Sequence, residues 1–136
     1  KKIKKKLFPK YSISTIYSRD GINFRKNESK KINLAKKGEY RIGRSKIFSI
    51  NKEKHLLLFT YGKADGTYRS GCATSKDLKN WKRKKVFGLE PSKKGFDSIH
   101  LAYPALIKNS LGEIFCFYNG NNMGEGGIGV AKLLKF

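Results

Sequence analysis

The chain has 136 residues and a net charge of +21, with 31 Lys and Arg against 10 Asp and Glu. It has no stretch of roughly 20 apolar residues and no apolar segment after its basic N-terminus, which argues against a membrane span or a signal peptide and favours a cytoplasmic protein. Only six of the basic residues are Arg, the side chain that contacts phosphates and bases bidentately, so nucleic acid is not the expected partner.

The first 37 residues are expected to hold a basic arm and two strands. Residues 1–10 begin with a run in which every residue of the first six except Ile3 is Lys, typical of a solvated arm. Strand-like patterns follow at 11–18 and 22–26. We call residues 11–37 the first unit and expect it to contain only outer strands of a repeated sheet.

Residues 38–87, the second unit, show the most complete pattern. Short apolar segments separated by turn residues predict strands at 41–50, 55–62, 67–75 and 80–86. Consecutive strands joined by such tight turns form an antiparallel meander. The second unit is therefore expected to be a complete four-stranded sheet.

Residues 88–136, the third unit, repeat most of this pattern. Strands are predicted at 101–108, 113–120 and 126–133. The Gly-rich segment before the last strand opens no helix, so it does not fit a phosphate-binding loop. Apolar residues do not recur at helical spacing over three turns anywhere in the chain, which predicts an all-β fold.

An internal repeat of about 58 residues links the units. The matched segments are 17–25 with 74–82, 45–48 with 104–107, 58–62 with 116–120, and 71–73 with 129–131. A four-stranded meander at this period is typical of a β-propeller blade, and propellers close with about four to eight blades. The chain is thus expected to be a single incomplete propeller of two to two and a half blades, with the strands at 41–50 and 101–108 innermost.

Two turns share the pattern Ser-x-Asp followed by an aromatic residue. Ser75 and Asp77 in the second unit, like their counterparts in the first, are expected to hydrogen-bond the backbone of the turn rather than take part in catalysis. Phe24 and Trp81, the aromatic residues, are expected to pack between blades. Of the two histidines, His55 is expected at the surface or at a strand edge.

Polar residues precede both predicted inner strands, at 38–45 and 96–104. In a propeller these segments surround the central channel, where hydroxyls or an anionic group of a sugar could be bound. The candidate binding residues are Arg41, Arg44, Asp97, His100, Tyr103, Asn119 and Asn121, and the weak catalytic candidates are Glu39 and Asp97. The alternative is that they are ordinary loop residues with local ion pairs.

The two cysteines, Cys72 and Cys116, lie inside predicted strands between apolar or small neighbours. Their spacing fits no metal-binding motif, so we expect buried free thiols. His, Cys and carboxylate residues do not cluster at metal-ligand spacing elsewhere, and no nucleotide-binding loop is present. Neither a metal nor another cofactor is expected.

Several motifs carry a resemblance to a known family. They are D-G-I-N-F in the first outer turn, E-Y-x-I-G-R before the inner strand of the second unit, G-L-E-P-S-x-x-G-F-D-S, and F-Y-N-G-N-x-x-G-x-x-G-I-G-x-A near the C-terminus. Together they resemble the last blades of five-bladed propellers in glycosidase-like proteins related to glycoside hydrolase families 32, 43 and 68. The resemblance implies a piece of such a propeller, a sugar ligand, and a role in glycan hydrolysis or binding.

Glycosidases of that group use pairs of carboxylates from successive inner strands. The resemblance leads us to expect a Glu after Asp97-Ser98, but Ile99 stands there and cannot transfer a proton. Arg41 and Arg44 would hold Glu39 ionised if they pair with it, which is the opposite of what a general acid needs. We therefore expect that this chain alone does not hydrolyse glycosides.

Two hypotheses from different classes remain. The first is a carbohydrate-active propeller fragment, as an enzyme or as a sugar binder. The second is a basic interaction module that binds an acidic partner such as nucleic acid or an anionic polysaccharide. In either case the open faces of the outer blades should lead to self-association or to assembly with further blades. We expect these faces to include Ile13, Ile16, Phe24, Phe115 and Phe117.

Overall fold

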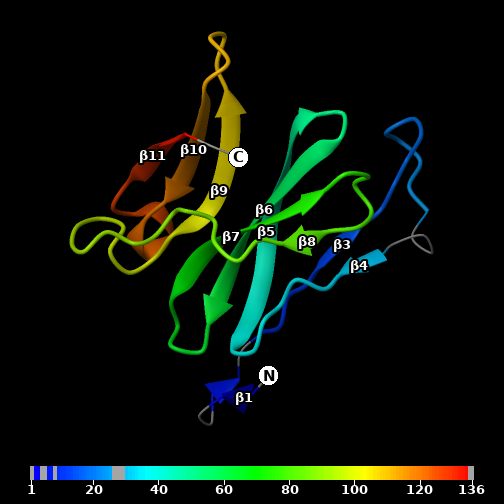
Figure 1. Cartoon of the computed structure of the whole chain (residues 1–136). Helices are drawn as coiled ribbons and strands as arrows, with labels where there is room; N and C mark the ends of the chain where they lie inside the picture. Colours follow the sequence, from blue (N-terminus) through cyan, green and yellow to red (C-terminus); the bar gives the residue numbers. More distant parts are fainter. Residues whose placement is uncertain (1, 4–5, 8, 26–29, 135–136) are drawn as a thin grey trace.

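A computed structural model describes residues 2–3, 6–7, 9–25 and 30–134 (Figure 1). The strands are β1 (Lys2–Ile3), β2 (Lys6–Leu7), β3 (Ile13–Thr15), β4 (Lys30–Ile32), β5 (Glu39–Asn51), β6 (Lys54–Lys63), β7 (Tyr68–Ser75), β8 (Lys82–Arg83), β9 (Ala102–Lys108), β10 (Ile114–Asn119) and β11 (Ile128–Leu133), with a 3-10 turn η2 (Asn121–Gly124). The described part contains no α-helix, so the predicted all-β class is confirmed. Among these residues no helix is long and apolar enough to cross a membrane.

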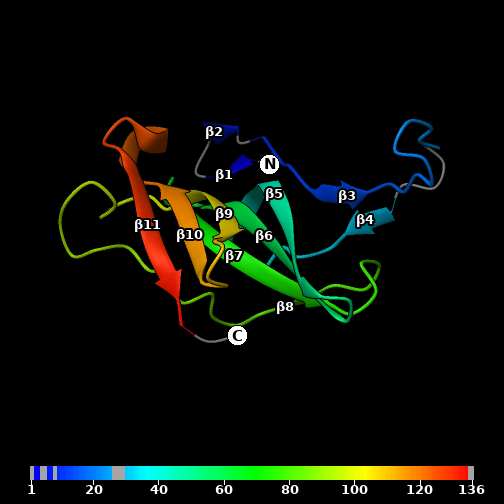
Figure 2. The same ribbon diagram turned by 90° about the horizontal axis from the view of Figure 1, so that it is seen from above.

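The strands form four separate antiparallel sheets, none of them closed. The largest is the meander β5-β6-β7-β8, which we call the central sheet. A three-stranded sheet, β9-β10-β11, lies on one side of it and the pair β3-β4 on the other, as two perpendicular views show (Figures 1 and 2). The small pair β1-β2 lies within the predicted basic arm. The three larger sheets follow the order of the three sequence units.

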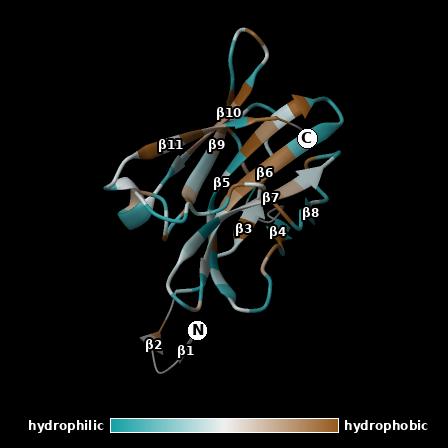
Figure 3. Ribbon diagram, turned by 60° about the vertical axis from the view of Figure 1, so that its left-hand side comes forward, coloured by the Kyte–Doolittle hydropathy of each residue, from teal (hydrophilic) through white to brown (hydrophobic). Residues whose placement is uncertain are grey.

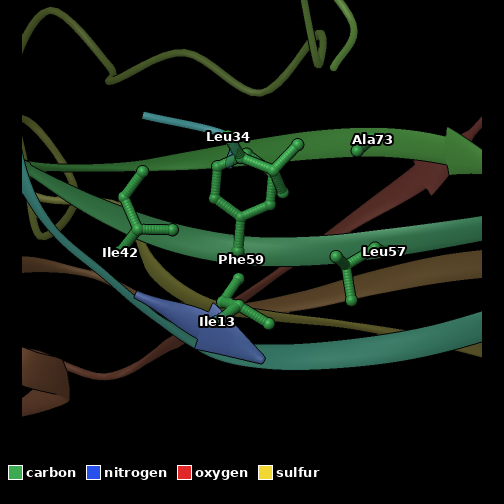
Figure 4. Packing of buried hydrophobic residues seen from close by; sticks show 6 residues of the cluster. All are labelled: Ile13, Leu34, Ile42, Leu57, Phe59 and Ala73. Carbon is green, nitrogen blue, oxygen red and sulfur yellow. The ribbon is translucent and has the colours of Figure 1, made fainter. Parts of the chain in front are cut away.

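Both faces of the central sheet are buried because side chains alternate along β6. Leu57 and Phe59 point to one face, where Ile13 and Leu34 of the first unit cover them (Figure 4). Leu58 points to the other face, into a second cluster that also includes Leu56 and Cys72. Full burial of such a side chain stabilises a fold by about 1.5–3 kcal/mol. The central sheet is thus held from both sides by its neighbours in sequence.

The third unit supplies the cover for the second face. Leu106 of β9 packs against Leu56, Leu58 and Cys72. Leu101, at the entry to β9, is fully buried, and its N–H donates to the Tyr68 carbonyl at 3.1 Å. Hydrophobic colouring follows the strands of the three-stranded and central sheets, whereas the connecting loops are mostly hydrophilic (Figure 3).

The two Ser-x-Asp turns have the same hydrogen-bond network, as the sequence predicted. Asp20 Oδ1 accepts from the Ser18 hydroxyl and from two backbone N–H groups, at 2.7–2.9 Å. Asp77 Oδ1 accepts from Ser75 in the same way and from the N–H groups of Lys79 and Asn80. Both aspartates serve as turn-forming residues on the outside of the sheets.

Three strands differ from their predicted extents. No strand forms over residues 22–25 (residue 26 lies outside the described residues), and β3 pairs with β4 at Lys30–Ile32 instead. The Asp20 carboxylate binds the backbone N–H groups of Ile22 and Asn23, which leaves them unable to join a ladder. At the other turn, the predicted strand at 80–86 shortens to Lys82–Arg83.

The structure also corrects one segment of the sequence repeat by one residue. In the second unit Ile47 pairs with Leu57, and in the third unit Leu106 pairs with Cys116. Leu57 therefore corresponds to Cys116, whereas the sequence comparison matched Cys116 with Leu58. Because side chains alternate, a shift of one residue exchanges the two faces of a strand.

Two glycines confirm the corrected alignment. A Cβ on Gly71 would collide with the ring of Phe59, and a Cβ on Gly129 would collide with the ring of Tyr118. Each glycine lies directly opposite its aromatic residue on the neighbouring strand. Phe59 and Tyr118 are thus equivalent, and each packs over a strand that must lack a side chain at that point.

The predicted exposed faces are partly correct. Ile16, Phe24 and Phe117 are exposed, and Phe115 is half-buried. Ile13 is buried, contrary to prediction, because the side of β3 that carries it packs onto the central sheet rather than facing outward.

One histidine also lies elsewhere than expected, whereas the cysteines lie as predicted. His55 is 8% exposed and hydrogen-bonds the Ser49 hydroxyl at 2.7 Å, because β6 is an interior strand paired on both sides. Cys72 and Cys116 are buried free thiols. Burial raises the pKa of each thiol to about 11.

Candidate functional site

A cavity of about 470 Å³ lies where residues of all three units meet. It is lined by Tyr11, Ser12, Arg41, Ile42, Gly43, Arg44, Thr60, Tyr68, Tyr103 and Met123. None of these lining residues is acidic, and two are Arg. Three of the predicted binding residues, Arg41, Arg44 and Tyr103, are therefore brought together here.

Arg44 and Tyr103 reach the cavity through the same backbone device. Arg44 lies in an irregularity of β5 between Gly43 and Lys46, and its φ is +54°. Tyr103, at the equivalent position of β9, also has a φ of +54°. The guanidinium carbon lies 5.3 Å from the centre of the tyrosine ring, a cation–π contact. The Tyr103 N–H donates to Thr60 Oγ1 at 2.7 Å, which fixes the strand at this point.

Arg41 is held among tyrosines. Its guanidinium donates to the Tyr68 hydroxyl and lies 5.3 Å from the ring centre of Tyr40 and 5.8 Å from that of Tyr68. Desolvation opposes the charge of Arg41, but the hydrogen bond to Tyr68 outweighs it and raises the pKa of the guanidinium. Arg41 is thus a fixed positive charge on the cavity wall.

The first unit closes one side of the cavity. The Tyr11 N–H donates to the Tyr40 carbonyl at 3.2 Å, and the Ile42 N–H donates to the Tyr11 carbonyl at 3.4 Å. These bonds form a short parallel bridge beside β5. They place Tyr11 and Ser12 next to Arg41 although about 30 residues of sequence separate them.

His100, Asn119 and Asn121 do not line this cavity. The Asn121 side chain accepts from the N–H groups of Ile99 and His100, at 2.8 and 2.9 Å, and donates to the Gly95 carbonyl at 3.1 Å. It shapes the loop before β9. Asn119 donates to a carbonyl within η2 at 2.7 Å.

His100 is packed rather than free. Its Nδ1 accepts from the Tyr68 N–H at 3.1 Å, which assigns the neutral tautomer with a proton on Nε2. Desolvation by burial, followed by the nearby charge of Arg69, lowers the pKa of the imidazole. His100 thereby ties the loop before β9 to the start of β7.

The two weak catalytic candidates also lie outside the cavity. Asp97 is 5% exposed and accepts from the Tyr118 hydroxyl at 2.9 Å. Burial, together with this hydrogen bond, raises the pKa of Tyr118 to about 12. Glu39 forms a bidentate ion pair with Arg83, at 2.5 and 2.9 Å, so its partner is neither Arg41 nor Arg44.

Sequence reasoning missed Tyr68 and Thr60. Both could have been found from strand pairing: Gly62 pairs with Arg41 on one side and with Tyr68 on the other, and Thr60 pairs with Gly43. Residues opposite a predicted site residue on the next strand lie within reach of it. Within the ranges that the structure describes, no group of three or more His, Cys, Asp or Glu side chains is placed to hold a metal ion.

Comparisons with known proteins identify the fold. No protein-family model matches the chain, and no curated protein matches it. Two solved structures do, one described as a complex of BT0996 with RGII and one as a glycoside hydrolase, each with a TM-score of 0.56 and 19% identity. Each match covers 79% of this chain and 33% of the other, so the chain spans about a third of their length. The chain therefore shares an all-β fold with part of a glycoside hydrolase.

Proposed function

We propose that this chain is part of a five-bladed β-propeller related to glycoside hydrolase families 32, 43 and 68, and that its cavity binds a sugar. The observation that carries the proposal is the meeting of Arg44 and Tyr103, equivalent residues of consecutive units, at one cavity. Side chains at equivalent positions of innermost strands converge in this way around a propeller axis. The blades would be residues 11–37, 38–87 and 88–136, with β5 and β9 innermost.

The two faces of each unit support a propeller arrangement. Leu58, on the face of the central sheet that the third unit covers, corresponds to Phe117 in the corrected alignment. Phe117 is 40% exposed, and its cross-strand neighbour Val130 is 58% exposed. The third unit thus presents outward the face that the second unit uses to bind its successor. A further unit of the same repeat is the occupant that this face fits.

Binding, rather than cleavage, fits the side chains of the cavity. Hydrolysis of a glycoside needs two carboxyl groups about 5–10 Å apart. None lines the cavity, the carboxylate of Glu39 is neutralised by Arg83, and Asp97 is buried beneath Tyr118. Tyrosine rings and guanidinium groups are suited to stack on a sugar ring and to donate to its oxygens.

The second hypothesis, a basic module for an acidic macromolecule, receives no support from the comparisons. The solved structures that match are related by fold to glycan chemistry. We therefore propose sugar binding alone.

A binding experiment tests the proposal. The 136-residue chain is titrated with a panel of mono- and oligosaccharides while NMR follows the cavity residues. Binding should be lost in Tyr103→Ala and kept in Phe24→Ala, which removes an exposed aromatic side chain outside the cavity. A folded chain that binds no sugar of the panel would refute the proposal.

An activity assay tests the absence of cleavage. The chain should not turn over aryl glycosides at a rate typical of enzymes. Turnover that is abolished both by Glu39→Gln and by Asp97→Asn, in variants that keep the native circular dichroism spectrum, would contradict the proposal and make these residues the acid and base.

A further inference from the structure

We infer that the cavity selects a sugar that carries a negative charge, either a carboxylate or a sulfate. This inference rests on the proposed function and adds the substrate class to it. It depends on three features of the lining residues: their charge, the state of Arg44, and the balance between hydrogen-bond donors and acceptors.

The charge of the cavity is positive and is not offset by its own walls. Arg41 and Arg44 line it, and no lining residue is acidic. The two acidic residues of the inner segments are used elsewhere: Glu39 pairs with Arg83, and Asp97 accepts from Tyr118. A net charge of +21 adds long-range attraction for an anion.

Arg44 is available to a ligand. Among the residues that the structure describes, its one interaction is the contact with the Tyr103 ring. Its side chain is exposed toward the cavity that it lines. A guanidinium over an aromatic ring keeps its N–H groups for other acceptors, and these N–H groups match the two oxygens of a carboxylate. Arg83 shows the contrast, since it is already engaged by Glu39 and by the Leu34 carbonyl.

Donors outnumber free acceptors on the cavity wall. Arginine side chains only donate. The Tyr68 hydroxyl already accepts from Arg41, and Thr60 Oγ1 already accepts from the Tyr103 N–H. A neutral sugar brings as many donors as acceptors, whereas a carboxylate or sulfate brings acceptors only. The wall therefore complements an anionic group better than a hydroxyl.

The test compares matched sugars on the intact 136-residue chain by calorimetric or NMR titration. Glucuronate is paired with glucose, galacturonate with galactose, and glucose 6-sulfate serves as the sulfated probe. We expect each acidic sugar to bind about tenfold or more tightly than its neutral counterpart, the difference that a charge-assisted hydrogen bond gives. Tighter binding of the uronates identifies a carboxylate as the preferred group, and tighter binding of the 6-sulfate identifies a sulfate.

Two variants with the same change in charge locate the effect. Arg44→Gln should remove most of the preference for the acidic sugar. Lys46→Gln, two residues along β5 and outside the cavity, should keep it. A preference that survives Arg44→Gln or that falls equally in Lys46→Gln would come from overall charge and would overturn the inference.

The outcomes separate this inference from the function on which it rests. Equal affinity for glucose and glucuronate would overturn the inference and leave sugar binding intact. Failure of a folded chain to bind any of the five sugars would overturn both.

Discussion

The guanidinium carbon of Arg44 lies 5.3 Å from the centre of the Tyr103 ring, and both residues have a φ of +54°. They occupy equivalent positions of two consecutive units. A left-handed conformation costs a residue other than Gly roughly 1–2 kcal/mol. The same unfavourable backbone conformation is thus used twice, and each time it directs a polar side chain into one cavity.

This conformation predicts how position 44 responds to substitution. Arg44→Val should lower the free energy of unfolding by about 1–2 kcal/mol, because a β-branched residue is poorly tolerated at positive φ. Lys46→Val, at an exposed site on the same strand, should change it by less than about 0.5 kcal/mol. Urea denaturation measures both. Equal effects at the two positions would show that the backbone of Arg44 is not constrained.

The ion pair between Glu39 and Arg83 should be important for stability. Their side chains are 9% and 12% exposed. Arg83→Gln should cost about 3–5 kcal/mol, since it leaves a largely buried carboxylate without its partner. Lys132→Gln breaks the exposed pair with Glu113 and should cost less than about 1 kcal/mol. If Arg83→Gln costs no more than Lys132→Gln in urea, the buried pair is not formed.

The turn aspartates predict a dependence of stability on pH. Hydrogen bonds from the Asn80 and Lys79 backbone N–H groups, and then from side chains, hold the pKa of Asp77 far below its ordinary value. The pKa of Asp20 is lowered by the same kind of network, led by the Asn23 N–H. A carboxyl whose pKa is lower in the folded chain stabilises the fold above about pH 4 and loses that contribution as the pH falls further.

The corresponding experiment compares urea denaturation at pH 5.5 and pH 2.5. The chain should be less stable at the lower pH, and Asp77→Asn should show a smaller difference between the two conditions. An unchanged difference in the variant would mean that the Asp77 network does not contribute.

The paired glycines predict a matched effect in two units. Gly71→Ala and Gly129→Ala should each destabilise the fold by about 1–3 kcal/mol, because the added methyl group meets the ring of Phe59 or Tyr118. Gly43→Ala should be tolerated, since no atom lies within 4 Å of the added Cβ. A tolerated Gly129→Ala would contradict the equivalence of Phe59 and Tyr118.

The outer face of the third unit predicts self-association of the isolated chain. Phe117→Lys should shift the chain toward the monomer, because it places a charge in the middle of an apolar face. Leu111→Lys changes a loop residue that is 82% exposed and should leave association unchanged. Light scattering over a wide concentration range measures both. A monomeric parent chain at all concentrations would refute the prediction.

Part of the fold could be predicted because its causes are local. Alternating apolar residues bounded by turn residues gave β5, β6, β7, β9, β10 and β11 to within a few residues. The Ser-x-Asp turns were predicted because their hydrogen bonds join residues two or three apart. The predicted strand at 22–26 failed because the same turn chemistry binds its first N–H groups.

Predictions that depended on contacts between units were less successful. Ile13 was expected to face outward, and His55 was expected at an edge, yet both are buried. The repeat was matched one residue out of register along β6, since apolar residues run without interruption there and leave the face undetermined. The partner of Glu39 is Arg83, which lies 44 residues away in sequence.

The sequence by itself determined the all-β class, the order of the strands, the two turn networks and three of the cavity residues, because each follows from short-range pattern or from residue type. The tertiary structure alone decided which face of each strand is buried, since a strand has two faces and only its neighbours choose between them. It also decided which candidates share a site. Arg41, Arg44 and Tyr103 meet at the cavity, whereas Asp97 and Asn121 are engaged by contacts that only the packed sheets create.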